Sequence, residues 1–395
     1  MRFRRFGRTG LNMPVFSCGG MRYQHSWNDQ PLSAIPAEGQ TNLEATIRRA
    51  LELDIVHIET ARGYGTSELQ LGQILPELPR DRLIVQTKVS PCEDARQFEA
   101  TLETSFANLK LDRVDLLGIH GINLPEHLDW TIRPGGCLDV IRRWQAQGRI
   151  GHVGFSTHGP TEVIVQAIET DAFDYVNLHW YYIFQRNWPA IEAATRHDLG
   201  VFIISPANKG GMLYNAPQKL IDLCAPLSPM VFNNLFCLNH PQVHTLSIGA
   251  AKPTDFDEHI ETLDLLDRAA ELLPPIIDRL EQAAIEALGS DWYHTWNVGL
   301  PHWSETPDNV NMETILWLRN LAIAYDMTEY GKMRYNLLGN GGHWFPGKRL
   351  QSSEVEQFTS VLQRSPHRDR IPTLLKETHD LLGGEAVKRL SQSAS

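Results

Sequence analysis

The sequence predicts an α/β protein, a (β/α)8 TIM barrel followed by an all-helical C-terminal extension. Eight short apolar segments alternate with helical patterns over about 270 residues, the arrangement of a barrel. The length of 395 residues suits one barrel of about 250 residues plus a smaller unit. The strand pattern ends near Asp267. We therefore expect a barrel domain over residues 1–267 and a helical extension over residues 268–395.

The predicted strands are short and almost continuously apolar, as parallel strands covered by helices on both faces are. They comprise residues 14–18, 54–60, 83–89, 114–120, 152–157, 175–180, 201–206 and 245–249. An open doubly wound sheet is the alternative, and it calls for a G-x-G-x-x-G turn after its first strand. Gly19 and Gly20 are followed instead by Met21, which favours the barrel.

Helical patterns lie between the strands and dominate the extension. In the barrel they cover residues 41–53, 95–109, 137–147 and 161–169. In the extension they cover residues 276–288, 313–325, 354–364 and 373–382. We expect residues 391–395 to be disordered, as chain ends often are.

Charge and cysteine usage exclude several classes of protein. The net charge of −11 has the wrong sign for phosphate contacts, so we expect no nucleic-acid partner. No segment reaches the ~20 apolar residues of a membrane helix, and no apolar core of a signal peptide follows the basic start. Five cysteines without CxxC spacing disfavour a disulfide framework or a zinc site. We expect a cytoplasmic protein that does not contact membranes.

Four ionisable side chains follow three consecutive predicted strands. Glu59 and Tyr64 come at the end of the second strand, Lys88 at the end of the third and His120 at the end of the fourth. Each alone fits a structural role, such as a rim ion pair for Lys88. Because the carboxyl ends of barrel strands meet at one face, we expect the four to converge there as an active site.

This set suits proton donation to a carbonyl oxygen. A free phenol with a pKa of about 10 is a poor acid at neutral pH. A lysine ammonium beside the phenol favours its phenolate, and a buried carboxylate keeps that lysine charged. The histidine can orient the substrate oxygen. The hydride that completes a carbonyl reduction must come from a nicotinamide cofactor.

At these residues the sequence resembles the aldo-keto reductases over the whole predicted barrel. The segment from Glu59 to Gly65, E-T-A-R-G-Y-G, is similar to the family signature D-T-A-x-x-Y-G. Lys88 and His120 complete the family's tetrad. The resemblance implies that Tyr64 donates the proton, Lys88 and Glu59 tune it, and His120 orients the substrate. Glu59 replaces the family's usual Asp, and we expect its pairing with Lys88 to survive with shifted geometry.

The resemblance also implies cofactor-binding residues. They are Ser156, Thr157, Asn177, Ser205, Lys209, Lys252 and Glu258. Thr157 stands for a usual Asn and Asn177 for a usual Gln, and the aromatic residue that usually precedes Ser205 is absent. Asp255 occupies the place of the arginine that commonly holds the 2′-phosphate. Because Lys209 and Lys252 can bind a phosphate, we expect NADP, with NAD left open.

The extension resembles a branch of the family whose C-terminal domain is helical and ferredoxin-like. Members of that branch bind four-iron clusters through cysteine motifs, yet no cysteine follows Cys237 here. The two motif regions contain Trp292 and His367 instead. Clusters need thiolates, so we expect no iron–sulfur cluster and a retained scaffold. We expect no metal at His294, His302, His343 or His367, and a protein partner for the extension stays open.

Three functions are compatible with this pattern. The leading hypothesis is an NAD(P)H-dependent oxidoreductase that reduces a small-molecule aldehyde or ketone. The alternative is a nicotinamide-binding barrel with little turnover that acts as a redox sensor or partner subunit. A third is a Schiff-base aldolase that uses Lys88, which the neighbouring Glu59 and Tyr64 disfavour because both favour a charged lysine.

Overall fold

The computed structural model describes residues 1–339, 345–351 and 355–384. The chain divides into two compact units. The first comprises Met1–Gly211 and Asn233–Ala269, and the second comprises Met212–Phe232 and the described part of Ala270–Arg389. The expected domain boundary at residue 267 stays a prediction, because a division of the chain into compact units does not show that each unit folds on its own.

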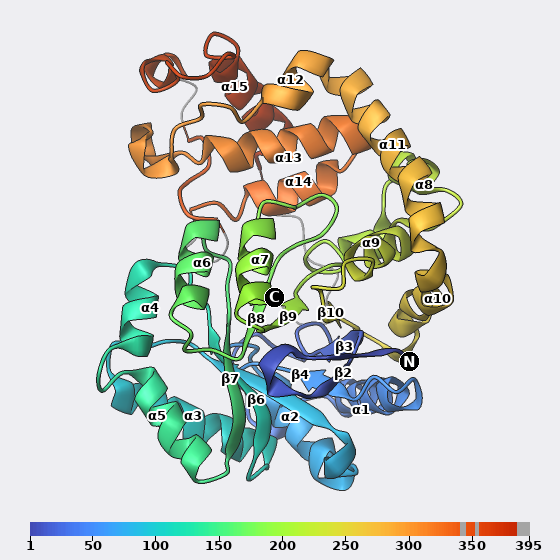
Figure 1. Cartoon of the computed structure of the whole chain (residues 1–395), viewed down its shortest axis with the longest axis vertical. Helices are drawn as coiled ribbons and strands as arrows, with labels where there is room; N and C mark the ends of the chain where they lie inside the picture. Colours follow the sequence, from blue (N-terminus) through green and yellow to red (C-terminus); the bar gives the residue numbers. More distant parts are fainter. Residues whose placement is uncertain (340–344, 352–354, 385–395) are drawn as a thin grey trace. The chain divides into compact units, whose positions relative to one another are not determined.

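Eight parallel strands close into a barrel in the first unit, and helices surround them (Figure 1). The strands follow one another around the ring, and β10 closes it by pairing with both β3 and β9. Their bounds are Phe16–Gly19 (β3), His57–Glu59 (β4), Ile84–Val89 (β5), Val114–His120 (β6), Ile150–Ser156 (β7), Tyr175–Leu178 (β8), Gly200–Ile203 (β9) and Thr245–Ile248 (β10). The predicted (β/α)8 barrel is therefore confirmed.

A hairpin that the sequence analysis missed precedes the barrel. Strands β1 (Phe3–Arg5) and β2 (Asn12–Pro14) pair antiparallel, so Pro14 belongs to the hairpin rather than to the first barrel strand. Phe6 and Met13 from this region are fully buried in a core cluster with residues of the barrel interior. Each hairpin strand has only three residues, and β1 contains two arginines, so neither strand carries an apolar run that would have predicted it.

All four helical segments predicted in the barrel are observed, and further helices lie between the other strands. Two have the predicted bounds, α3 (Ala95–Leu109) and α6 (Thr161–Glu169). The Asp94 side chain caps α3 by accepting a hydrogen bond from the Arg96 backbone N–H. The others are α1 (Ala37–Glu52), α2 (Ser67–Ile74), α4 (Pro125–Ile132), α5 (Cys137–Ala146), α7 (Trp188–Arg196) and α10 (Asp257–Leu265). Helix α9 spans Pro229–Leu238.

The second unit is helical, as predicted. Its helices include α8 (Gln218–Cys224), α11 (Ala269–Leu288), α12 (Ser290–Thr295), α13 (Met312–Tyr325), α14 (Thr328–Tyr335) and α15 (Ile371–Leu382). Helix α13 packs against α14 and α15. The predicted helix over residues 354–364 is wrong for its described part, which forms a short 3-10 helix (Glu356–Ser360) followed by turns that lead into Pro366. Residue 354, His343 and residues 391–395 lie outside the described residues.

The two regions where cysteine motifs were sought lie in contact within the second unit. The ring centroids of Trp292 and His367 are 4.9 Å apart. His367 Nε2 is 2.8 Å from Thr295 Oγ1, and Trp292 Nε1 donates to Asn320 Oδ1 at 2.8 Å. We call these four residues the Trp292–His367 cluster. Aromatic and imidazole rings therefore fill the place where the resemblance puts cluster ligands, and the absence of an iron–sulfur cluster stays a prediction.

Candidate active site

The four predicted catalytic residues lie together at the carboxyl ends of three neighbouring strands. Glu59 ends β4, Lys88 lies one residue before the end of β5, and His120 ends β6. Lower in the barrel, His57 Nε2 and Gln86 Oε1 are 3.1 Å apart in the interior. Because side chains alternate along a strand, Glu59 and Lys88 face the same interior, two residues nearer the mouth.

Glu59 and Lys88 form a buried ion pair. The Lys88 ammonium contacts Glu59 Oε1 and donates to the carbonyl oxygen of Thr60 at 2.8 Å. Both residues are almost fully buried, since Lys88 is 1% exposed and Glu59 is 3% exposed. Burial lowers the pKa of Lys88 well below its ordinary value, and the Glu59 carboxylate opposes that change because it stabilises the charged form. The longer Glu side chain thus keeps the expected contact with lysine.

Gly118 makes room for the lysine stem on the neighbouring strand. Lys88 and Gly118 are register partners on β5 and β6. A Cβ atom at Gly118 would lie 2.8 Å from Lys88 Cγ, closer than real Cβ contacts. Gly118 was not among the predicted site residues, although a glycine within an apolar strand is a recognisable sign of close approach.

Tyr64 reaches the ion pair from the loop after β4. Its hydroxyl donates to Glu59 Oε1 at 3.5 Å, and Lys88 Nζ lies 4.9 Å from the centre of its ring. The ring packs edge-on against His120, with 5.5 Å between centroids. Gly65 has a φ of +53°, and a Cβ atom there would lie 2.0 Å from the Ser26 carbonyl oxygen, so the turn requires glycine. The half-buried phenol is thus held beside a carboxylate, an ammonium and an imidazole.

Two of the predicted cofactor residues, Ser156 and Asn177, lie on β7 and β8, and Thr157 directly follows β7. Ser156 pairs in register with His120 on one side and Asn177 on the other. Asn177 is fully buried, and neither its side-chain oxygen nor its nitrogen has a hydrogen-bond partner among the described residues. Thr157 differs, because its hydroxyl donates to the Ile122 carbonyl oxygen at 2.7 Å and accepts from Gly159 N–H at 2.9 Å.

Two other predicted residues line a hollow at the mouth of the barrel. Ser205 and Lys209 come from the loop after β9, and Glu59 and Tyr64 form part of the same wall. Its remaining walls include Gly19, Met21, Arg22, His158, Ile204, Ala207, Gly210, Gly211, Ser247 and Gly249. Lys252, which is exposed, and Glu258, in the first turn of α10, are not among the lining residues.

Arg22 supplies positive charge that the sequence analysis did not anticipate. Its guanidinium is 3.3 Å from the Asp255 carboxylate and donates to the Gly249 carbonyl oxygen. The same Asp255 oxygen accepts the Ala251 N–H at 2.8 Å. Asp255, which the resemblance places where the family commonly has a phosphate-binding arginine, is therefore paired with an arginine from the loop after β3. The available signal was the position of Arg22, three residues after the first barrel strand ends at Gly19, because residues that follow barrel strands lie at the active-site face.

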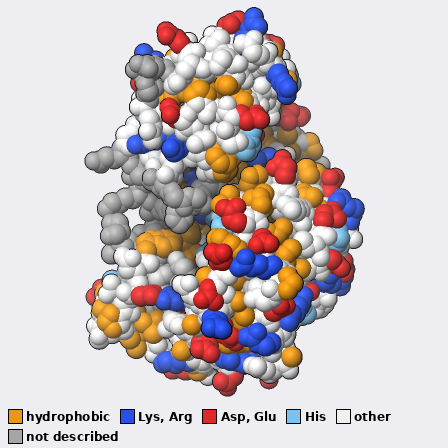
Figure 2. Space-filling model, turned by 90° about the vertical axis from the view of Figure 1, so that its left-hand side faces the viewer, with side chains coloured by type: hydrophobic (Ala, Val, Ile, Leu, Met, Phe, Trp, Pro, Cys, Tyr) orange, Lys and Arg blue, Asp and Glu red, His pale blue; other side chains and the backbone are white. Residues whose placement is uncertain are grey.

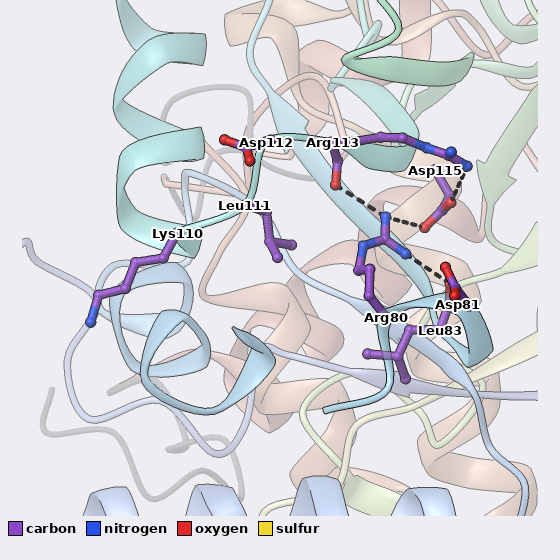
Figure 3. Close-up of a pocket in the computed structure, with 8 residues that line it drawn as sticks. All are labelled: Arg80, Asp81, Leu83, Lys110, Leu111, Asp112, Arg113 and Asp115. Carbon is purple, nitrogen blue, oxygen red and sulfur yellow. Dashed lines mark hydrogen bonds and ion pairs between the residues drawn. The ribbon is translucent and has the colours of Figure 1, made fainter. Parts of the chain in front are cut away.

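A second depression, of about 350 Å³, lies at the opposite ends of the strands (Figure 3). Arg80 precedes β5 and Arg113 precedes β6, and both pair with Asp115, at 2.7 and 3.0 Å. The Asp115 carboxylate also accepts the Val85 N–H at 2.8 Å. These charges satisfy one another at the amino-terminal face, where barrel residues generally serve stability. We therefore place the candidate site at the mouth with Tyr64.

Other classes of site find little support in the described residues. Lys and Arg are interspersed with Asp and Glu on the face shown in Figure 2. No group of three or more His, Cys, Asp or Glu side chains in the described part of the chain could hold a metal ion. Among the described helices, none alone is long and apolar enough to cross a membrane, and one bent pair, Gln218–Cys224 with Pro229–Leu238, meets the length and composition test.

Known proteins share the barrel. A Bacillus halodurans aldo-keto reductase structure superposes with a TM-score of 0.56 at 18% identity, over 71% of this chain and 96% of that one. A Klebsiella pneumoniae aldo-keto reductase solved with NADPH gives a TM-score of 0.54 at 20% identity, over 69% and 95%.

Curated relatives match over shorter stretches. A Glycine max protein described as an aldo-keto reductase is 21% identical over 54% of this chain, and L-glyceraldehyde 3-phosphate reductase of Escherichia coli is 24% identical over 40%. The matches span 63% and 46% of these relatives, respectively. The model of the aldo/keto reductase family matches residues 17–266, more than half of the sequence. Together with the closed barrel and the residues gathered at its mouth, this match shows that the chain belongs to the aldo/keto reductase family.

Proposed function

We propose that this protein is an NAD(P)H-dependent oxidoreductase that reduces an aldehyde or ketone, with Tyr64 as the proton donor. The observation that carries the proposal is the buried Lys88–Glu59 pair directly beside the Tyr64 phenol. A cation next to a phenol lowers the free energy of the phenolate, which is what remains after proton donation. Family membership adds independent support, because reductase activity is attached to the names of the relatives.

The cofactor proposal is supported by the polar groups near the mouth. Asn177 offers a buried amide whose donor and acceptor lack partners in the described structure, and a carboxamide such as that of nicotinamide could satisfy both. Ser156 would hold the same group, while Ser205 and Lys209 would contact the phosphates. Lys252 and Glu258 would bind the adenosine half of the cofactor. Thr157 would contribute indirectly, because its hydroxyl holds the turn that follows Ser156. We favour NADP over NAD because Lys209 and Arg22 both line the hollow.

When bound, the reduced nicotinamide supplies a hydride to the carbonyl carbon of the substrate. The Tyr64 hydroxyl gives its proton to the carbonyl oxygen, so a C–H and an O–H bond form as the C=O π bond breaks. Lys88 stabilises the resulting phenolate, and Glu59 keeps Lys88 charged and in place. His120, edge-on to Tyr64, would orient the carbonyl oxygen. Tyr64 regains its proton from solvent.

The alternative is a nicotinamide-binding barrel with little turnover, as a redox sensor or partner subunit. The engaged Thr157 hydroxyl and the position of Lys252 outside the hollow favour it, because both reduce the contacts available to a cofactor. A protein partner for the C-terminal extension stays a prediction in either case.

The test is to mix the protein with NADPH or NADH and a panel of aldehydes and ketones, and to follow cofactor absorbance and binding. Substrate-dependent cofactor oxidation is the expected result. Cofactor binding without oxidation by any carbonyl would overturn the reductase and support the sensor. An adduct at Lys88 trapped by borohydride, without cofactor, would support the Schiff-base aldolase instead.

A further inference from the structure

Two cysteines that lie far apart in the sequence are in contact at the carboxyl-terminal face of the barrel. Cys92 lies in the loop between β5 and α3, and Cys137 is the first residue of α5. The Cys92 backbone N–H donates to Cys137 Sγ at 3.5 Å, and the Cys137 thiol donates to the Cys92 carbonyl oxygen at 3.3 Å. A separation of 45 residues is no recognised cysteine motif, so the fold alone brings the two residues together.

Neighbouring contacts join the two segments that carry these cysteines. Arg133, in the turn before α5, donates to the Glu93 carbonyl oxygen at 2.7 Å. The indole N–H of Trp144 in α5 donates to the Glu99 carboxylate in α3 at 3.0 Å, and the two helices pack side by side (Figure 1). The contact between the cysteines therefore belongs to a larger interface between neighbouring parts of the barrel.

The geometry of the pair is compatible with a disulfide. Since a backbone N–Cα bond is about 1.46 Å long, Cys137 Sγ lies within about 5 Å of the Cys92 Cα atom. A disulfide joins residues whose Cα atoms are roughly 4.4–6.8 Å apart. In the reduced chain the Cys92 thiol donates to Gln97 Oε1 at 3.3 Å, so it must rotate about its Cα–Cβ bond to reach Cys137. Cys92 lies in a loop and is half-buried, so this rotation does not disturb the packed core.

The two thiols differ in their access to solvent. Cys92 is half-buried, whereas Cys137 is fully buried, and burial raises the pKa of the Cys137 thiol. The other three cysteines, Cys18, Cys224 and Cys237, are also fully buried, and burial raises the pKa of each. A protonated thiol is a weak nucleophile. An oxidant in solution therefore reacts with Cys92 first, and the Cys137 thiol lies beside it as a resolving partner.

We propose that Cys92 and Cys137 form a redox modification site, which reacts with a hydroperoxide and closes into a reversible disulfide. The Cys92 thiolate attacks one peroxide oxygen, the O–O bond breaks, and the other oxygen leaves as an alcohol that takes up the thiol proton. The Cys137 sulfur then attacks the Cys92 sulfenic acid, an S–S bond forms, and the sulfenic oxygen leaves as water. Two thiols are oxidised as one hydroperoxide is reduced to an alcohol and water. This inference goes beyond the proposed function and does not depend on it.

The cross-link would join two segments that leave the active-site face. Cys92 follows Lys88 by four residues, and Cys137 begins a helix that comes after the strand ending at His120. Neither cysteine is among the residues that line the hollow with Tyr64. Oxidation would therefore tie the two segments together without itself filling the hollow.

The test is to map disulfides after oxidation of the reduced, cofactor-free protein with hydrogen peroxide. Free thiols are blocked with N-ethylmaleimide, and the unreduced chain is digested with trypsin, which places Cys92 in residues 89–96 and Cys137 in residues 114–142. We expect these two peptides to be linked, with a mass two hydrogen atoms below their sum. The thiol count of the denatured chain should fall from five to three, and dithiothreitol should restore it. The remaining three cysteines are internal controls and should stay free.

Single substitutions separate the roles of the two cysteines. Cys92→Ser should leave Cys137 reduced, whereas Cys137→Ser should leave a sulfenic acid at Cys92 that dimedone labels. In wild type that label should disappear as the disulfide forms. If hydrogen peroxide leaves all five thiols free, the inference is wrong. A wild-type Cys92 that ends as a sulfinic acid, or that links to a second copy of the chain instead of to Cys137, would also overturn it.

Discussion

The mouth of the barrel and the Trp292–His367 cluster differ in whether their buried polar side chains have hydrogen-bond partners. In the cluster, Trp292 donates to Asn320, and His367 and Thr295 are bonded to each other. At the mouth, Asn177 is buried with neither polar atom partnered among the described residues. A buried polar group without a partner costs on the order of 1–3 kcal/mol. The cluster therefore contributes to stability, whereas the unpartnered amide at the mouth lowers the stability of the cofactor-free protein by a free energy that a bound ligand can offset.

Removal of the Trp292 ring from the cluster should have the largest effect, a loss of stability of the second unit. Trp292→Ala should lower the free energy of unfolding of the second unit by about 3–5 kcal/mol, because it leaves a cavity where a fully packed ring was. Hydrogen exchange of the α13 amides measures this directly. Trp292→Phe, which keeps a ring, should lose less. If the Ala variant loses under about 1 kcal/mol, the cluster is not the packed centre that we describe.

Removal of the phenol at the mouth should affect rate rather than stability. Tyr64→Phe should lower kcat by ~10²-fold or more, the scale of a lost general acid, while the cofactor Kd stays nearly constant. Steady-state kinetics and a binding titration measure the two quantities. Tyr293→Phe, at a half-buried tyrosine of the second unit, is the matched control and should leave kcat unchanged. A Tyr64 variant that keeps more than half the activity would remove Tyr64 from the mechanism.

The unpartnered amide gives the sharpest test of the comparison. Asn177→Leu should leave the cofactor-free protein as stable or more stable, because it removes a buried polar group that lacks partners. It should also weaken cofactor binding about tenfold. Thermal melting with and without NADPH measures both effects. Thr157→Val should show the reverse pattern, a loss of stability near 1 kcal/mol with little change in cofactor Kd, because its hydroxyl holds a turn. If Asn177→Leu destabilises the cofactor-free chain, the amide has a structural role.

The smallest expected effect concerns pH. Burial lowers the pKa of His57 and His259 to about 3 and that of His244 to about 4. The unfolded chain protonates these histidines near pH 6.5, so between that value and 3–4 it binds more protons than the folded chain. Stability should therefore fall as pH drops below about 6.5. Urea unfolding at pH 7, 6 and 5 measures the slope.

A substitution separates His57 from the other titrating groups. His57→Gln should make the pH slope shallower, and His294→Gln, at an exposed position, should not. Equal slopes in wild type and His57→Gln would mean that the pKa of His57 does not differ between the folded and unfolded chain.

The pattern of apolar segments is enough to predict the barrel and the face that carries its active site. Eight apolar runs at regular intervals can be buried on both faces only in a parallel sheet wrapped by helices. Parallel strands place their carboxyl ends at one face, so Glu59, Lys88 and His120 were brought together by their positions along three consecutive strands. The hairpin at the start escaped prediction because each of its strands has only three residues, too few to show a period.

Contacts between residues distant in the chain were decided only by the tertiary structure. The pairing of Arg22 with Asp255 joins positions 233 residues apart, and no local pattern encodes it. The same holds for the contact between Cys92 and Cys137, for Gly118 beside Lys88, and for the packing of Trp292 against His367. Periodicity reports which face of an element is buried, whereas the partner of a buried side chain depends on how closed strands and packed helices bring loops together in space.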